Sequence, residues 1–296
     1  MKRSGNHCRL SGNAISKITA PSYPKAEKTM DRTTARIKEH LKALKLSTME
    51  KILDQELAKA ATENSPLSTT ILHLLEAEVQ AARSRRIERR IRDSALAERK
   101  LLADFDFGFQ KGIDKNQIME LATLGFVERK QGLILAGSSG TGKSHIAKAL
   151  LLIACSNLYS CRYTTASNML SDLMASLCDG TLDKALKLYT RPQILLIDEI
   201  GFDRIEQESA RNAALFFKVI DARYCKGSTI VTCNINFKEL GDYLGDPIIT
   251  TCLVDRMVHH SIIIHVEGPS YRMHESRELN RSSKKRGIDH SEVTHG

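Results

Sequence analysis

Tryptophan is absent from this chain of 296 residues, and aromatic side chains make up only 5% of it. Stacking of nucleic-acid bases on aromatic rings is therefore poorly supported, so any contact with a nucleic acid is expected to be mainly ionic. No apolar run approaches the roughly 18 residues of a membrane span, and residues 1–34 lack the apolar stretch of a secretory signal. These absences predict a cytoplasmic protein with no membrane contact.

The cysteines and histidines lack the spacing of a metal site. There are seven cysteines, an odd number, with no C-x-x-C pair, and several lie inside apolar patterns. Such cysteines are typical of reduced core residues in the cytosol and not of a disulfide framework. His259 and His260, with His265 nearby, match no ligand motif, so no metal site is predicted there.

Positive charge is concentrated in the first third of the chain. The formal net charge is +9, and residues 1–104 contain 21 Lys and Arg against 13 Asp and Glu, whereas the remaining 192 residues contain 23 against 22. This asymmetry favours a polyanion as the partner of the first segment and a different role for the second. The alternative is a solvated helical surface that only keeps the protein soluble.

A glycine-rich loop between an apolar run and a helical pattern is the most specific motif. GSSGTGKS (residues 137–144) follows LILA and precedes HIAKALLLIA, an arrangement whose backbone N–H groups and helix N-terminus bind phosphate. Lys143 supplies a charge for the β- and γ-phosphates, and Ser144 supplies a hydroxyl for Mg²⁺. The predicted nucleotide-binding residues are Gly137, Ser138, Ser139, Gly140, Thr141, Gly142, Lys143, Ser144 and His145.

Two carboxylates end a second apolar run, QILLIDEIG (residues 193–201). Ligands of parallel sheets collect at the carboxyl ends of strands. Asp198 is therefore predicted to hold the Mg²⁺ shell beside Ser144, and Glu199 to polarise the water that attacks a γ-phosphate. The alternative is a strand that ends in two acidic residues for solubility.

Two further polar residues follow later apolar runs. Asn234 ends STIVTCN, where its amide can sense the γ-phosphate or the attacking water, although asparagine is also a common turn former at strand ends. Arg256 lies in LVDRMVHH, where it can reach the γ-phosphate of a neighbouring protomer and stabilise developing charge. Its quiet alternative is a local salt bridge with Asp255 or Asp246.

RSRRIERRIR (residues 83–92) places a cationic face on a helix. At about 100° per residue the arginines lie opposite Ile87 and Ile91, so one side packs while the other is positive. Contact with DNA phosphates is the leading interpretation, and an idle exposed face or a protein-docking face are the alternatives. The candidate DNA-binding residues are Arg83, Arg85, Arg86, Arg89, Arg90 and Arg92.

The order of apolar patterns predicts an α/β fold. From residue 133 onward, β-rich runs alternate with helices, which is typical of a three-layer P-loop core with a five-stranded parallel sheet. Before it, helical periodicity from Ile37 to Ala60, with a break near Leu46, and a helix opening at Ser65–Pro66 and running to about Leu96, predict a small all-α domain. The predicted strands are residues 133–136, 161–165, 194–198, 229–232 and 262–266.

GSSGTGKS, ILLIDEIG, STIVTCN, LVDRMVHH and EGPSYR resemble, in this order and spacing, the AAA+ ATPases of the IstB and DnaC type. LATLGFVERKQGLILAG (residues 121–137) narrows the resemblance to IstB, the ATP-binding helper encoded beside the transposase of certain bacterial insertion sequences. The chain after the last strand is too short for a full C-terminal lid, which IstB and DnaC relatives also lack. Composition predicts a flexible leader (1–34) and a polar tail (274–296), which the resemblance does not cover. Between them we expect a helical basic DNA- or partner-binding domain (35–104) and an AAA+ ATPase domain (105–273).

The resemblance implies an ATP-dependent regulator that binds double-stranded DNA, assembles on it as a homo-oligomer and recruits or activates a cognate transposase, with ATP and Mg²⁺ as cofactors. By motif, residues 137–144 would be Walker A, Asp198 and Glu199 Walker B, Asn234 sensor 1 and Arg256 an arginine finger acting in trans. Lys143, Glu199, Asn234 and Arg256 would carry catalysis, and DNA is expected to stimulate it. Phe105 and Phe107 either flank the adenine or anchor the linker.

Three other functions stay open at this point. A DnaC-like replicative helicase loader shares the ATPase machinery and differs in the partner that its amino-terminal helices contact. A P-loop kinase needs an acceptor pocket and a lid, for which the chain after the last strand offers little material. A module that binds ATP without turnover is disfavoured by Glu199 and Asn234.

Overall fold

The computed structural model describes residues 25–201, 209–235, 240–244 and 246–278. By its internal contacts the chain divides into two compact units, Met1–Ala82 and Arg83–Gly296. The domain boundary predicted between residues 104 and 105 stays a prediction. Residues 1–24 and 279–296, which include most of the predicted leader and tail, lie outside the described residues.

The first unit consists of α1 (Lys25–Ala43), α2 (Ser47–Glu63) and the first part of α3 (Leu67–Asp93). Leu41, Leu53 and Leu74, one from each helix, form its small core. The predicted break near Leu46 is present between α1 and α2. However, α1 begins at Lys25, inside the segment predicted to be a flexible leader. Residues 25–30 (KAEKTM) contain no Gly or Pro and mostly good helix formers, which explains the earlier start.

Glu78 of α3 caps the N-terminus of α2. Its Oε2 accepts hydrogen bonds from the backbone N–H groups of Thr48 (2.7 Å) and Met49 (3.1 Å). The first N–H groups of a helix lack acceptors within the helix, so this buried carboxylate satisfies two of them. A long-range cap therefore fixes the angle at which α2 meets α3.

Helix α3 starts and ends close to the predicted positions. The carbonyl of Pro66 accepts from Thr69 N, so Pro66 rather than Ser65 lies at the helix boundary. The helix ends at Asp93, before the predicted Leu96, because Ala95 adopts a left-handed conformation (φ 59°). The carbonyl of Ser94 then accepts a hydrogen bond from Tyr163 N (2.7 Å), which joins the end of α3 to the edge of the sheet.

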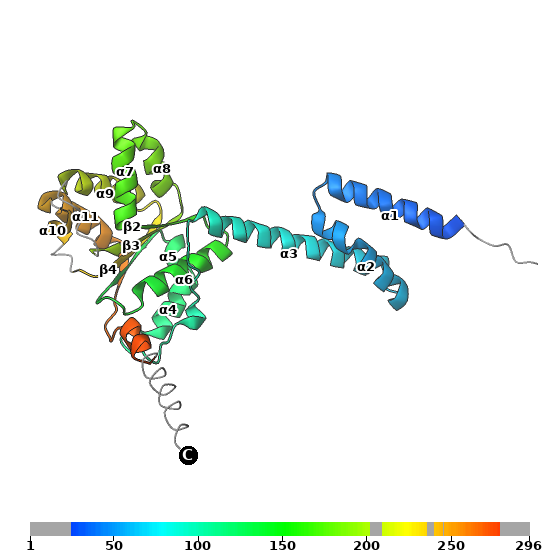
Figure 1. Ribbon diagram of the computed structural model, residues 1–296, viewed down its shortest axis with the longest axis horizontal. Helices are drawn as coiled ribbons and strands as arrows, with labels where there is room; N and C mark the ends of the chain where they lie inside the picture. Colours follow the sequence, from blue (N-terminus) through cyan, green and yellow to red (C-terminus); the bar gives the residue numbers. More distant parts are fainter. Residues whose placement is uncertain (1–24, 202–208, 236–239, 245, 279–296) are drawn as a thin grey trace, which may run out of the picture. The chain divides into compact units, whose positions relative to one another are not determined.

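The second unit is built around a five-stranded parallel sheet with the strand order β2-β3-β4-β1-β5 (Figure 1). This confirms the predicted α/β P-loop fold, and all five predicted strands are present within two residues of their predicted ends. The strands are β1 (Gly132–Ala136), β2 (Cys161–Thr165), β3 (Ile194–Ile200), β4 (Ser228–Cys233) and β5 (Ser261–His265).

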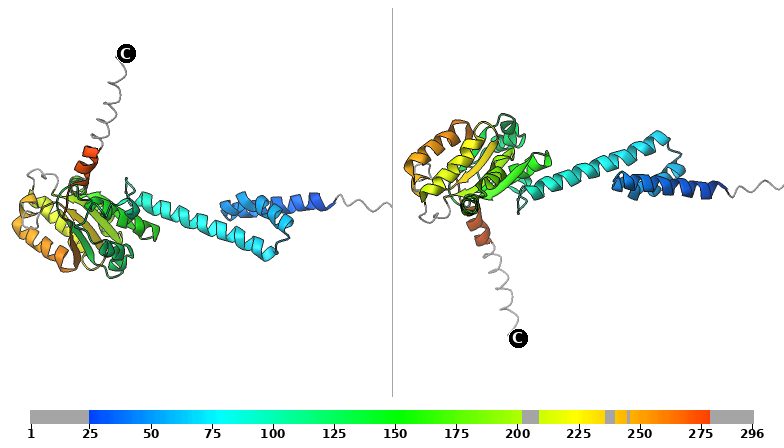
Figure 2. Two further views of the ribbon diagram at one scale, coloured as in Figure 1. Left: turned by 90° about the horizontal axis from the view of Figure 1, so that it is seen from below. Right: turned by 90° about the horizontal axis from the view of Figure 1, so that it is seen from above.

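Helices cover both faces of this sheet, as two further views also show (Figure 2). Side chains alternate along each strand. Leu133 and Leu135 of β1 therefore pack in the core on one face of the sheet, beneath a first set of helices. Ile134 packs in the core on the opposite face, beneath a second set. The first set is α4 (Lys115–Ala122), α5 (Gly125–Glu128) and α6 (Lys143–Ser156). The second set is α7 (Ala166–Cys178), α8 (Leu182–Thr190), α9 (Ser209–Arg223), α10 (Leu240–Leu244) and α11 (Pro247–His259).

The cysteines differ in part from the prediction. Cys155, Cys161 and Cys233 are buried, as expected for core residues, but Cys178, Cys225 and Cys252 are exposed, because they lie at helix and turn positions that face outward. Cys8 lies outside the described residues. In the described part of the chain, no cluster of His, Cys, Asp and Glu has the arrangement of a metal site, and no helix is long and apolar enough to cross a membrane.

Candidate nucleotide-binding site

The glycine-rich loop lies between the carboxyl end of β1 and the N-terminus of α6, as the motif predicts. Gly137, Gly140 and Gly142 all have positive φ angles (147°, 81° and 98°), which side chains with a Cβ rarely adopt. A Cβ at Gly137 would also collide with the carbonyl of Val266, and one at Gly142 with the ring of Phe105. The loop is thus held in a shape that only glycines at these positions permit.

Lys143 is the first residue of α6 and is 7% exposed. Its ammonium donates to the carbonyls of Gly137 (2.8 Å) and Ser138 (2.6 Å), so it is folded back over the loop. Burial lowers the pKa of Lys143, and the nearby carboxylate of Asp198 partly opposes that effect. A charge that the protein holds in a partly dry site interacts strongly with any phosphate that enters the loop.

Ser144 and Asp198 meet as predicted. Ser144 Oγ donates to Asp198 Oδ1 (2.7 Å), and the hydroxyl of Thr232 in β4 donates to the same oxygen. Asp198 is fully buried at the carboxyl end of β3. Hydroxyl and carboxylate oxygens are the protein ligands that Mg²⁺ prefers. The donor set therefore fits a Mg²⁺ ion, which Ser144 and Asp198 would hold directly or through water.

Glu199 follows Asp198 in the chain but has the opposite environment. The register between β3 and β4 shifts here, so that Asp198 and Glu199 together oppose the single residue Thr232. Within this bulge Glu199 has a φ of 63°, and its N–H donates to Thr232 Oγ1 (2.9 Å). A left-handed non-glycine residue costs about 1 kcal/mol. The consequence is that the Glu199 side chain is exposed in the cavity while Asp198 stays buried.

Asn234 directly follows β4 and lines the same cavity as Glu199. With its amide nitrogen facing β3, it donates to the carbonyls of Ile200 (2.6 Å) and Gly201 (3.3 Å). The position of this side chain is compatible with both interpretations of Asn234. It holds the turn after β3, and it lies beside the predicted phosphate position. Its sensor role stays a prediction.

A cavity of about 550 Å³ opens over the glycine-rich loop. Its walls include residues 139–145 and Lys148 along the loop and α6, with Glu199 and Asn234 on the sheet side. Phe105 also lines it and packs edge-to-face on His145, whose ring is 2.8 Å from the carbonyl of Leu101. Phe107 lies behind Phe105 (ring centroids 4.7 Å apart) and is not among the lining residues. Of the two phenylalanines, Phe105 is thus the one placed to contact a base.

The segment after β5 supports the loop from outside, which sequence reasoning missed. Tyr271 N donates to the carbonyl of Gly140 (2.9 Å), and the buried amide of Gln110 donates to the carbonyls of Thr141 (3.0 Å) and Pro269 (2.8 Å). Residues 271–278 are helical, and Arg272 lines the cavity close enough to Lys143 to lower its pKa further. EGPSYR contained Arg272, but nothing in its local pattern indicates this position.

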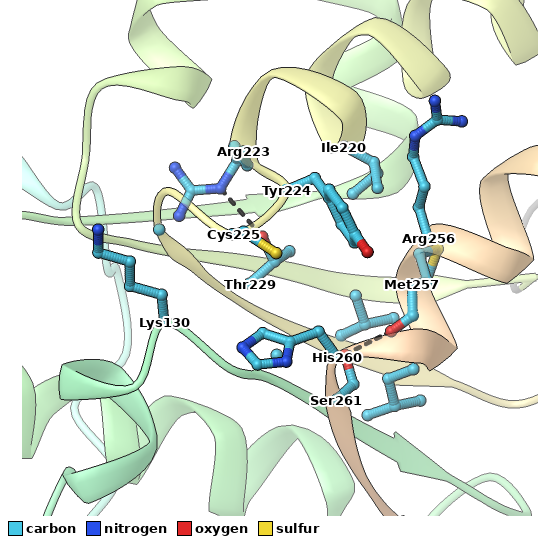
Figure 3. Close-up of a pocket in the computed structure, with 14 residues that line it drawn as sticks. Lys130, Ile220, Arg223, Tyr224, Cys225, Thr229, Arg256, Met257, His260 and Ser261 are labelled. Atoms are coloured by element: carbon cyan, nitrogen blue, oxygen red, sulfur yellow. Dashed lines mark hydrogen bonds between the residues drawn. The ribbon is translucent and has the colours of Figure 1, made fainter.

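Arg256 lies at the other end of the sheet. It borders a small cavity of about 40 Å³ whose walls include Gly132 and Ser261, the first residues of β1 and β5 (Figure 3). The glycine-rich loop follows the last residue of β1, so Arg256 faces away from the loop of its own chain. Figure 3 shows its side chain extending away from His260 and Lys130 at the rim.

The local partner of Arg256 is neither of the two carboxylates expected. Its Nε lies 2.9 Å from Asp221 Oδ1 in α9, and its guanidinium stacks 4.5 Å from the ring centroid of Phe217. Asp246 instead caps α11 by accepting from Ile248 N and Ile249 N. The side chains of Arg256 and Asp221 are 33% and 50% exposed, so the pair is weak and available for exchange.

The arginine-rich part of α3 has the predicted two-sided character. Ile91 is buried and Ile87 half-buried in the core beneath α6, whereas all six arginines are exposed. Glu88, the acidic residue among these arginines, forms a bidentate pair with Arg99 (2.6 and 3.1 Å), and this pairing lowers the pKa of Glu88. Arg99 therefore leaves the surface more positive than the helix alone indicates.

The model of the family described as IstB-like ATP binding protein matches residues 39–279. The chain belongs to the IstB-like ATP binding protein family. This confirms the resemblance inferred from the motifs.

The IstB-like chain is also similar to individual proteins. It is 35% identical over 242 residues to the protein named as the ATP-binding protein of insertion sequence IS5376 from Geobacillus stearothermophilus, covering 82% of this chain and 95% of that protein. It is 33% identical over 241 residues to the corresponding protein of insertion sequence IS232 from Bacillus thuringiensis, covering 81% and 95%. Among solved structures, that of the DnaC helicase loader aligns with a TM-score of 0.46 at 19% identity, covering 58% of this chain and 98% of that chain.

Proposed function

We propose that this chain is an ATP-hydrolysing, DNA-binding helper of transposition that assembles on duplex DNA in the cytoplasm and recruits or activates a transposase. The family and the glycine-rich loop support ATP binding. The names of the relatives, which refer to insertion sequences, support the transposase as partner. A replicative helicase, the alternative partner, finds no such support in these names.

The cavity carries the groups that ATP hydrolysis requires. Lys143 and the loop N–H groups bind and orient the phosphates, and Arg272 adds a second cation nearby. Glu199, exposed in the cavity, orients the attacking water and accepts its proton. Asn234 holds the neighbouring turn and faces the same space. When bound, Mg²⁺ supplies charge that neutralises the phosphate oxygens.

We also propose that the bound nucleotide controls DNA binding. A short chain of contacts between the arginine surface and Asp198 supports this. Ser94, directly after α3, accepts a hydrogen bond from Tyr163 N (2.7 Å), and the hydroxyl of Tyr163 donates to Asp198 Oδ2 (3.4 Å). Burial, reinforced by the charges of Asp198 and Glu199, raises the pKa of Tyr163 and keeps it a donor. A movement of Asp198 is therefore expected to shift Tyr163 and, through it, the end of the helix that carries the arginines.

Assembly on DNA brings Arg256 into the mechanism. It lies far from the loop of its own chain and pairs only with the partly exposed Asp221 and the ring of Phe217 among the described residues. In a head-to-tail assembly, such a residue reaches the γ-phosphate bound by the next protomer and stabilises the charge that develops there. Hydrolysis then depends on assembly.

The test is steady-state ATP hydrolysis measured at increasing concentrations of duplex DNA, with assembly followed by size under ATP and under ADP. We expect DNA to stimulate hydrolysis and ATP to favour the larger species. Lys143→Ala serves as the control that removes nucleotide binding. Absence of hydrolysis, or hydrolysis and size that do not respond to DNA or nucleotide, would contradict the proposal.

A further inference from the structure

Lys148 lines the nucleotide cavity, and no motif accounts for it. It lies on α6 four residues after Ser144, within the otherwise apolar pattern HIAKALLLIA, and its side chain is 16% exposed. Its Nζ is 3.6 Å from Asp198 Oδ2. Residues four apart lie on the same side of a helix, so Ser144 and Lys148 address the same carboxylate from one helix face.

The two oxygens of Asp198 have different partners. Oδ1 accepts hydrogen bonds from the hydroxyls of Ser144 and Thr232, whereas Oδ2 faces the Tyr163 hydroxyl (3.4 Å) and Lys148. Hydroxyls carry no net charge. Within the described part of the chain, Lys148 is the only cation that forms an ion pair with this fully buried carboxylate. An ionised carboxylate without such a partner is strongly disfavoured in the interior.

Lys148 also pairs with a second carboxylate. Its Nζ is 3.7 Å from Glu98 Oε2, in the segment that follows α3, and lies 5.2 Å from the centroid of the Tyr163 ring. Glu98 is itself paired with Lys100 (2.6 Å) and is 55% exposed. Lys148 thus stands between the buried carboxylate and a solvated one, over an aromatic face that tolerates a cation at either place.

We propose that Lys148 is the resident counter-ion of Asp198, which neutralises this carboxylate in the metal-free protein and yields it to Mg²⁺ when the nucleotide binds. The ammonium and the metal ion compete for the same negative charge. Lys148 is therefore a positioning residue that sets the Mg²⁺ concentration at which the site loads. When displaced from Asp198, it keeps its pairing with Glu98, in the segment after the arginine-bearing helix. This inference rests on the proposed function, because it concerns the same Mg²⁺–nucleotide site.

Competition makes two opposite predictions for Lys148→Met, which keeps the apolar stem and removes the charge. Without metal, Asp198 loses its counter-ion, so the melting temperature falls by about 5 °C. With Mg²⁺, the metal no longer competes with the ammonium, so the Mg²⁺ concentration for half-maximal nucleotide binding falls about fivefold. Lys148→Arg keeps the charge and is expected to stay close to the wild type in both measurements.

The experiment uses the full-length protein with Lys148→Met, Lys148→Arg and the control Lys218→Met, which removes an exposed lysine from α9. Melting is followed in EDTA and in Mg²⁺–ADP, and ADP binding is titrated by calorimetry at a series of Mg²⁺ concentrations. The expected result is a loss of melting temperature for Lys148→Met in EDTA that Mg²⁺–ADP largely restores, with a lower Mg²⁺ requirement.

Two outcomes would overturn the inference. One is a Lys148→Met protein whose melting temperature falls equally with and without Mg²⁺–ADP, since this indicates a packing role alone. The other is a Mg²⁺ requirement equal to or above that of the wild type, because competition demands a decrease. If the wild-type protein itself binds no nucleotide with Mg²⁺, the proposed function fails instead, and the two failures are distinguished.

Discussion

Adjacent carboxylates acquire different chemistry at the end of β3. The bulge opposite Thr232 buries Asp198 among hydroxyls and Lys148, whereas the left-handed backbone at Glu199 exposes the next side chain in the cavity. Consecutive side chains of a regular strand also lie on opposite faces of the sheet. The bulge changes the direction of the Glu199 side chain beyond that alternation. One irregularity of the backbone therefore separates the buried carboxylate that we propose to hold Mg²⁺ from the exposed one that we propose to activate water.

Replacement of Glu199 by glutamine tests this separation. Glutamine has the same size and keeps the bulge, but it cannot accept the proton of the attacking water. We expect hydrolysis to fall by about 100-fold, while ATP affinity stays unchanged and the ATP-bound assembly on DNA persists. The measurements are steady-state hydrolysis and ATP binding by calorimetry. Glu120→Gln, an exposed residue of α4, is the matched control. Hydrolysis at the wild-type rate would show that Glu199 does not activate the water.

Residues with a local signature could be predicted from the sequence, and residues defined by long-range contacts could not. The residues of the glycine-rich loop are consecutive in one short motif, and Asp198 and Glu199 are consecutive in another. The apolar runs beside each motif identify it. Gln110 and Arg272 reach the loop only after the chain folds back from residues far from it in sequence. Lys148 had a weak signal, since a lone lysine in an apolar helix needs a partner, but its partner is 50 residues away.

At the scale of elements, α3 has two different roles along its length. Its first part packs in the amino-terminal unit through Leu74, while its last turns pack through Ile91 beneath α6 and expose the arginines. The helical period predicted the role of these last turns, because it places the isoleucines on one side of the helix and the arginines on the other. The first role includes Glu78 as a cap for another helix, and a capping residue that lies in a different helix leaves no pattern in the sequence.

Loss of that cap has a measurable effect. Glu78→Ala leaves the N–H groups of Thr48 and Met49 without this acceptor, so we expect the amino-terminal unit to lose about 1–2 kcal/mol of stability. Amide exchange in the first turn of α2 is expected to accelerate in parallel, while the ATPase core stays protected. Glu76→Ala, an exposed position on the same helix, is the control. Equal exchange in the two variants would contradict a capping role.

The arginine surface is tested by its dependence on salt. Neutralising Arg86, Arg89 and Arg90 to glutamine removes three phosphate contacts, so we expect weaker duplex binding and a slope of log affinity against log salt that is smaller by about 2–3. The control neutralises Lys184, Lys187 and Arg191, which lie exposed on and beside α8 and give the same change in net charge. An unchanged slope in the first variant would assign the surface to a protein partner.

At the scale of the whole molecule, a single protomer does not complete the proposed site. Arg256 borders the cavity at the amino ends of β1 and β5, and the glycine loop lies past the carboxyl end of β1. We expect Arg256→Ala and Glu199→Gln to be inactive separately, and their mixture to regain hydrolysis, because Glu199 of one variant meets Arg256 of the other. The measurement is hydrolysis by the mixture at saturating DNA. No recovery on mixing, with both variants still assembling, would contradict a finger in trans.

The fold itself was predictable because each strand is a short apolar run between helices. The five strands and the break between α1 and α2 follow from periodicity, and these are confirmed. The partners of Arg256 were not predictable in the same way. Asp255 and Asp246 were chosen for their closeness in sequence, whereas Asp221 lies on α9, which packs against α11.

The strand order also governs how the protein is made. Among the described strands β1 is the first to be synthesised, yet its hydrogen-bonding neighbours in the sheet are β4 and β5, which come last of these five. The glycine-rich loop therefore follows an unpaired apolar segment until β4 and β5 have been synthesised. Pairings so distant in sequence form slowly and leave strand edges open to aggregation. The nascent chain is consequently expected to acquire nucleotide affinity only after β4 and β5 have been synthesised, and to depend on chaperones until then.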